Sequence, residues 1–195
     1  NSMPGAPRAA ELTISRVIDE TVDVKTLVFE VPPDDRETFT YLPGQHLTLK
    51  VPSIQTASVA RCYSLSSAPS VERDLHVTVK RTPDGYASNW LCDNARPGMR
   101  LLALRPAGTF TPTPEMAELL LFAGGRGITP MMSIIKEALA QRRARITLVY
   151  ANRDERSIIF RVELAELVRR HPGQLVVHHW LQSVAGIPTV SDVTE

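Results

Sequence analysis

The chain has 195 residues, 43% of them hydrophobic and 22% charged, which is the composition of a globular protein with one large or two small domains. Its 22 lysines and arginines nearly balance 21 aspartates and glutamates, and the formal net charge of +1 excludes a global field that would attract nucleic acid or an anionic membrane. No apolar run approaches the ~18 residues of a membrane span. The two cysteines lack CxxC spacing, so we expect reduced thiols and a cytoplasmic protein.

Short strands dominate the first half of the chain. After a flexible tail at 1–9, residues 10–114 contain apolar segments punctuated by proline and glycine, and in two of these segments apolar and polar residues alternate with the period of a strand. Six strands are expected at 12–17, 26–31, 46–51, 61–64, 75–80 and 101–104, with a short helix at 87–92. Closure would remove the exposed edges, so the pattern predicts a six-stranded antiparallel barrel.

The pattern changes after residues 105–114, a stretch rich in proline and threonine that we interpret as the domain boundary. Strands and helices then alternate over 115–195, which predicts a βαβαβ unit with a parallel sheet. The expected elements are strands at 119–122, 146–150 and 175–179, and helices at 130–141 and 160–170. The predicted fold class is therefore β + α/β.

The helix expected at 130–141 has two distinct faces. Apolar residues repeat along one face, and polar residues occupy the other. The apolar face holds Met131, Ile134, Ile135, Ala138 and Leu139, and the polar face holds Ser133, Lys136, Glu137 and Gln141.

The segment Arg61-Cys62-Tyr63-Ser64 combines three kinds of side chain that a flavin dinucleotide requires. Arg61 and Tyr63 are two apart on a strand and so share a face, with the cation suited to a diphosphate and the ring suited to stacking on the isoalloxazine. Ser64 would donate a hydrogen bond near the flavin N5 and is our candidate catalytic residue. Taken alone, the segment is better explained by a cross-strand ion pair and a core tyrosine.

Two turns strengthen the interpretation as a flavin site. Gly85 allows close backbone approach, and Ser88 is expected at the start of the short helix, where free amides favour a phosphate. Ser88 could also be a simple N-cap. Downstream, Gly125 and Gly127 lie in a glycine-rich turn between a strand and a helix, the setting of a dinucleotide diphosphate site.

Thr129 is expected to cap that helix, and Pro130 to occupy its first position, in place of the third glycine of GxGxxG. After the next strand, Arg153 could favour a 2′-phosphate, whereas Asp154 and Glu155 could favour a free ribose hydroxyl. The choice between NADH and NADPH therefore stays open.

With these residues in place, the chain resembles the ferredoxin-NADP reductase superfamily, whose Arg-x-Tyr-Ser strand corresponds to 61–64. Within that superfamily, residues 59–65, 77–82, 85–92 and 150–157 are similar to the reductase components of actinobacterial 3-ketosteroid 9α-hydroxylases. The resemblance implies an FAD-binding barrel followed by an NAD(P)-binding domain. The implied cofactor-binding set is Arg61, Cys62, Tyr63, Ser64, Thr78, Val79, Lys80, Tyr86, Ala87, Ser88, Gly125, Gly127, Thr129 and Arg153.

The resemblance also implies a role in electron transfer. NADH would be the donor, and a Rieske-type oxygenase would receive electrons from FAD through a [2Fe-2S] centre. The family's later Cys-Gly-Pro segment and its four clustered cysteines are absent from this sequence, so we expect an incomplete second domain and no metal site within it. The alternatives are an FAD-binding module with a regulatory role and no turnover, and a barrel that binds no flavin.

Overall fold

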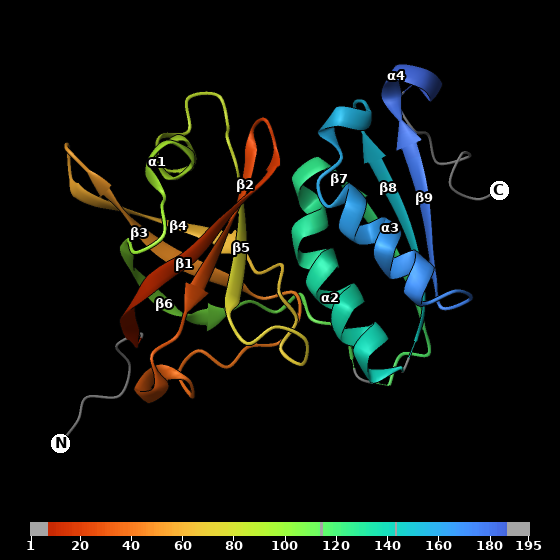
Figure 1. The fold of residues 1–195 in the computed structure, drawn as a ribbon, viewed down its shortest axis with the longest axis horizontal. Helices are drawn as coiled ribbons and strands as arrows, with labels where there is room; N and C mark the ends of the chain where they lie inside the picture. Colours follow the sequence, from red (N-terminus) through yellow and green to blue (C-terminus); the bar gives the residue numbers. More distant parts are fainter. Residues whose placement is uncertain (1–7, 114, 143, 187–195) are drawn as a thin grey trace.

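The computed structural model describes residues 8–113, 115–142 and 144–186, in which a barrel-like sheet and an α/β unit lie side by side (Figure 1). The first sheet is built from six strands. They are β1 (Ala9–Thr21), β2 (Val24–Glu30), β3 (His46–Ser53), β4 (Ala57–Ser64), β5 (Leu75–Lys80) and β6 (Arg100–Ala107). Their order is β4-β3-β6-β1-β2-β5, and every adjacent pair is antiparallel. The six predicted strands are confirmed.

The two outer strands of this sheet meet each other. Just beyond β4, Leu65 forms an isolated bridge with Val77 of β5, and the Ser66 amide donates to the His76 carbonyl at 2.8 Å. These contacts satisfy backbone groups that an open edge would expose. The sheet is therefore barrel-like, as predicted.

Alternation places one face of each strand inside the barrel. Leu47, Leu49 and Val51 are fully buried, as their period of two predicts. Helix α1 (Tyr86–Asn94) covers the core with Leu91 and Cys92, which are also buried. The short helix is thus part of the barrel's core and carries its N-terminus at the barrel's end.

The α/β unit is a parallel sheet with helices, as predicted. Its strands are β7 (Glu118–Gly124), β8 (Arg145–Asn152) and β9 (Leu175–Leu181), in the order β7-β8-β9. The helices are α2 (Ile128–Gln141), α3 (Arg161–Arg170) and the short α4 (Gln182–Ala185). Short 3-10 turns cover Pro33–Asp35, Gly125–Gly127 and Glu155–Ser157. No helix in the described part of the chain is long and apolar enough to cross a bilayer.

Several predicted strands were shorter than the strands in the structure. Strand β6 continues to Ala107, into the predicted linker, because Ala107 still finds a partner in His46 of β3. The predicted tail lies mostly outside the described residues, and its last residue, Ala9, already belongs to β1. Local composition marks where a strand weakens, but cross-strand hydrogen bonds decide where it ends.

Helix α2 lies between the barrel and the parallel sheet (Figure 1). The periodicity separates its two faces correctly, yet both faces are buried except at the end of the helix, where Gln141 is exposed. On the polar face, Ser133 is 0% exposed, Lys136 6% and Glu137 9%. These side chains contact the barrel loop at 65–74, so the polar face is an interface.

His76 provides a test of the barrel's response to pH. Its β5 position pairs with Val28 of β2, and burial lowers the pKa of the imidazole below 6.5. Just below pH 6.5 the imidazole is protonated in the unfolded chain and still neutral in the folded chain. The free energy of unfolding therefore falls as the pH drops through 6.5. We expect urea titrations to show this loss in the wild type and a smaller loss in His76→Gln. Equal losses in both proteins would assign the pH dependence to another group.

Candidate cofactor-binding site

A cavity of about 640 Å³ lies where the end of β4, the start of α1 and the turn before α2 meet. Its walls therefore come from both structural units. The lining residues are Arg61, Cys62, Tyr63, Ser64, Thr78, Lys80, Thr82, Asp84, Gly85, Tyr86, Ala87, Ser88, Arg126, Gly127, Thr129 and Pro130. The volume falls within the range of small-molecule and cofactor sites.

Strand β4 supplies a cation, a ring and a hydroxyl to this cavity. Arg61 is exposed, and its guanidinium donates to the Ala60 carbonyl at 2.8 Å, which leaves other donors for a ligand. Tyr63 is half-buried opposite Leu47, and burial raises the pKa of its phenol to about 12, although Arg61 opposes the shift. The ring therefore stays neutral at physiological pH. Ser64 follows at the end of the strand, opposite His46.

Helix α1 begins three residues earlier than an N-cap at Ser88 would require. Gly85 is its N-cap, so Ser88 lies within the first turn and is not the cap. The Ser88 hydroxyl bonds instead to Thr82 Oγ1 at 3.0 Å and to the Gly85 carbonyl at 3.3 Å. The backbone amides of the first turn have no acceptor within the helix and lie at the cavity wall. A Cβ on Gly85 would come within 1.9 Å of Thr82 Oγ1, so this turn has no room for a larger residue.

Helix α2 also begins two residues before its predicted start at Pro130. Gly127 is the N-cap, so Thr129 is buried inside the first turn and makes no capping hydrogen bond. Gly125 has a φ of +52°, a left-handed conformation that glycine adopts without strain. A Cβ there would lie 3.8 Å from Lys80 Nζ, which places this turn directly against the barrel.

Positive side chains predominate in the cavity. Arg61, Lys80 and Arg126 face one acidic lining residue, Asp84. Together with the free amides of α1 this donor set suits a diphosphate, and Tyr63 offers a flat ring beside it. The residues present therefore fit a flavin dinucleotide. The described residues contain no cluster of three or more metal-ligating side chains.

Three predicted residues do not line the cavity. Val79 is fully buried in the barrel core, because it alternates with Thr78 and Lys80 along β5. Gly125 lies just outside the lining, and Arg153 points to solvent with a side chain that is 80% exposed, 3.8 Å from Asp154. Their roles in binding stay predictions.

Sequence reasoning did not single out Arg126, Thr82 or Asp84 as site residues. A signal was present for Arg126, which stands between the glycines of the dinucleotide turn, where its side chain must project from a tight backbone. Thr82 and Asp84 precede Gly85, and they reach the cavity because the chain turns back before α1.

Asn152 is an unexplained polar group at the end of β8. It is 3% exposed, and neither its side-chain nitrogen nor its oxygen has a partner among the described residues. Buried amides normally find partners, and the carboxyl ends of parallel strands are where dinucleotides bind. The position fits the expected dinucleotide side of the protein.

Two family matches divide the chain as the fold does. Residues 11–111 match the oxidoreductase FAD-binding domain, and residues 121–191 match the oxidoreductase NAD-binding domain. The chain belongs to the ferredoxin-NADP reductase family of oxidoreductases. It thus combines an FAD-binding and an NAD-binding domain of that family, which confirms the predicted cofactor domains.

The sequence is also similar to those of several named reductase components. It is 52% identical over 191 residues to the 3-ketosteroid-9-alpha-monooxygenase ferredoxin reductase component of Rhodococcus rhodochrous, covering 98% of this chain and 54% of the relative. The component of the same name from Mycobacterium tuberculosis is 54% identical over 194 residues, with 96% and 54% covered. The glycine betaine monooxygenase reductase of Chromohalobacter salexigens is 38% identical over 159 residues, with 80% and 42% covered. The chain therefore spans about half the length of these curated relatives.

Solved structures share the fold. The flavohem-like FAD/NAD-binding domain of nitric oxide dioxygenase from Vibrio cholerae superposes with a TM-score of 0.78 at 26% identity, covering 88% of this chain and 73% of that one. A ferredoxin-NADP+ reductase from Plasmodium falciparum gives a TM-score of 0.79 at 22% identity, with 95% and 78% covered, and this likeness concerns the fold alone.

Proposed function

We propose that this chain is the FAD- and dinucleotide-binding part of a reductase that takes electrons from NADH and delivers them to an oxygenase system. One observation carries the proposal: a single cavity is lined both by the Arg61–Ser64 end of β4 and by the glycine-rich turn of the NAD-binding domain. A flavin held by the first wall would therefore adjoin a nicotinamide brought by the second.

Each wall has a separate task in this proposal. Arg61 and the first amides of α1 bind the FAD diphosphate, and the Tyr63 ring packs on the flat face of the flavin. Ser64 donates a hydrogen bond near N5. When bound, FAD accepts a hydride and releases single electrons. The turn at 125–127 and Thr129 hold the nicotinamide dinucleotide against that face.

The onward path rests on the relatives' names and on their greater length. We infer that electrons leave through a [2Fe-2S] centre outside residues 1–195 to a Rieske-type oxygenase that acts on 3-ketosteroids, because the relatives at 52% and 54% identity are reductase components of 3-ketosteroid-9-alpha-monooxygenase. The free cysteines Cys62 and Cys92 suit a reducing cytoplasm, which we propose as the location.

The test is anaerobic reduction of the purified, FAD-loaded protein. We expect a yellow protein whose visible flavin absorbance is bleached by one equivalent of NADH, with NADPH in a parallel titration to decide the donor. Dithionite serves as the control that the flavin is reducible. Retained FAD that dithionite bleaches but NADH does not would contradict turnover and favour an FAD-binding module. A colourless protein that ignores added FAD would overturn the flavin site itself.

A further inference from the structure

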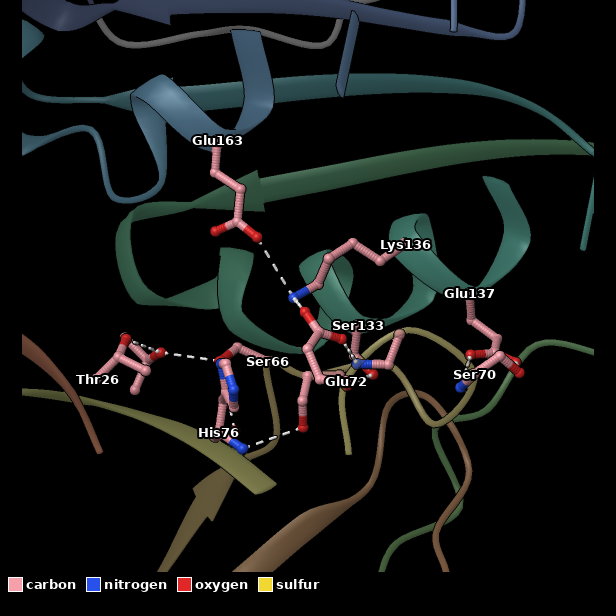
Figure 2. Close-up of polar contacts among 12 residues, drawn as sticks. Thr26, Ser66, Ser70, Glu72, His76, Ser133, Lys136, Glu137 and Glu163 are labelled. Atoms are coloured by element: carbon pink, nitrogen blue, oxygen red, sulfur yellow. Dashed lines mark hydrogen bonds and ion pairs between the residues drawn. The ribbon is translucent and has the colours of Figure 1, made fainter. Parts of the chain in front are cut away.

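A polar cluster joins the two structural units (Figure 2). We call it the interface cluster. It consists of Ser67, Ser70 and Glu72 from the loop at 65–74, Ser133, Lys136 and Glu137 from α2, and Glu163 from α3. The proposed function assigns no role to these residues. Ser67, Ser133, Lys136 and Glu137 are nevertheless among the most buried polar groups in the described part of the chain, whereas Glu72 is half-buried and Ser70 and Glu163 are exposed.

The contacts of the cluster run along α2 in order. The Ser133 hydroxyl donates to the Ser67 carbonyl at 2.6 Å. One turn further, the Glu137 carboxylate accepts from the Ser70 amide at 2.9 Å and from the Ser70 hydroxyl at 2.5 Å. The loop is thus fastened to the helix at successive turns.

Lys136 is the centre of this cluster. Its ammonium group pairs with Glu72 of the barrel loop and lies 3.4 Å from Glu163 Oε1 of α3, and its side chain is only 6% exposed (Figure 2). One buried cation therefore bridges a carboxylate of the FAD-binding unit and a carboxylate of the NAD-binding unit. Removing it would leave the half-buried Glu72 carboxylate and the more exposed Glu163 carboxylate without their partner.

The cluster connects the two walls of the cavity. The loop at 65–74 begins immediately after Ser64, and Lys136 lies seven residues after Thr129, which places both on the same face of α2. The flavin-binding strand and the dinucleotide turn are therefore linked through a short path of buried hydrogen bonds and ion pairs. A shift at Lys136 would move one wall relative to the other.

We propose that Lys136 is a positioning residue, which holds α2 and its dinucleotide turn in register with the flavin-binding strand. The proposal rests on the proposed function, since register matters only if two cofactors must meet. Reacting atoms have to approach within about 3–3.5 Å, and a displacement of ~1 Å can cost about 100-fold in rate. Buried ion pairs contribute little to net stability against apolar replacements, so orientation is the better account of this one.

The test compares Lys136→Met with Lys50→Met, an exposed lysine on β3, in the FAD-loaded protein. We expect Lys136→Met to bind FAD within ~3-fold of the wild type, while the single-turnover rate of flavin reduction by NADH falls ~10- to 100-fold. Hydrogen exchange should rise in the loop at 65–74 and in α2, and stay unchanged in β3. Lys50→Met should match the wild type in all three measurements.

Three outcomes overturn the proposal. Unchanged exchange would show that Lys136 does not hold the two units together. Faster exchange with an unchanged reduction rate per bound flavin would leave Lys136 a structural role only.

If Lys136→Met fails to fold, Glu72→Gln provides the test, because it removes one of the two carboxylates that pair with Lys136. It should raise hydrogen exchange and slow flavin reduction in the same way but more weakly. A wild-type reduction rate in Glu72→Gln counts against positioning. A wild-type protein that binds FAD but is not reduced by NADH contradicts the proposed function. The hydrogen exchange of Lys136→Met alone then decides whether Lys136 holds the two structural units together.

Discussion

Replacing Arg61 by alanine is expected to weaken FAD binding by ~10- to 100-fold, because hydrogen bonds to a charged group contribute about 1.5–3 kcal/mol and ~1.4 kcal/mol corresponds to tenfold in affinity. The side chain stands at the cavity wall, where one of its donors bonds to the Ala60 carbonyl and the others are available to a ligand. Titration of the apoprotein with FAD, followed by quenching of flavin fluorescence, measures the effect.

The matched control for this variant is Arg100→Ala. Arg100 is exposed on β6 and makes a 3.9 Å ion pair with Glu11, far weaker than a buried contact. Its loss should leave FAD affinity unchanged. If Arg61→Ala retains wild-type affinity while folded, Arg61 has no part in holding the diphosphate, and the assignment of the cavity's phosphate end must move to Lys80 or Arg126.

Replacing Ser64 by alanine is expected to slow flavin reduction by NADH about 100-fold with near-normal FAD content, since a single donor aimed at a reacting atom contributes at least on this scale. The hydroxyl lies at the cavity wall beside Tyr63, at the end of β4. Stopped-flow absorbance under anaerobic conditions gives the rate per bound flavin.

Ser58→Ala serves as the control for this second variant, because Ser58 lies on the same strand but is exposed and away from the cavity. We expect it to reduce at the wild-type rate. Equal rates for Ser64→Ala and the wild type would remove Ser64 from the catalytic assignment, and a large loss of FAD would assign it to binding.

Most of the cavity's β4 and α1 residues could be predicted because they are close in sequence. The period of two along β4 places Arg61 and Tyr63 together without any knowledge of the rest of the fold. The caps were harder to predict. Ser88 and Thr129 have the side chains of N-caps, yet Gly85 and Gly127 occupy those positions, because tight turns before each helix begin it earlier.

The sequence by itself determined the order of elements, the inward side of each barrel strand and the two faces of α2, since these follow from local backbone periods of 2.0 and 3.6 residues. Only the tertiary structure decided that the polar face of α2 is covered and that Arg126 meets Lys80 and Arg61 at one cavity. The physical reason is the sequence separation of the segments that interact. Whether a polar face meets water or another surface depends on which distant segment packs there, and no local period carries that information.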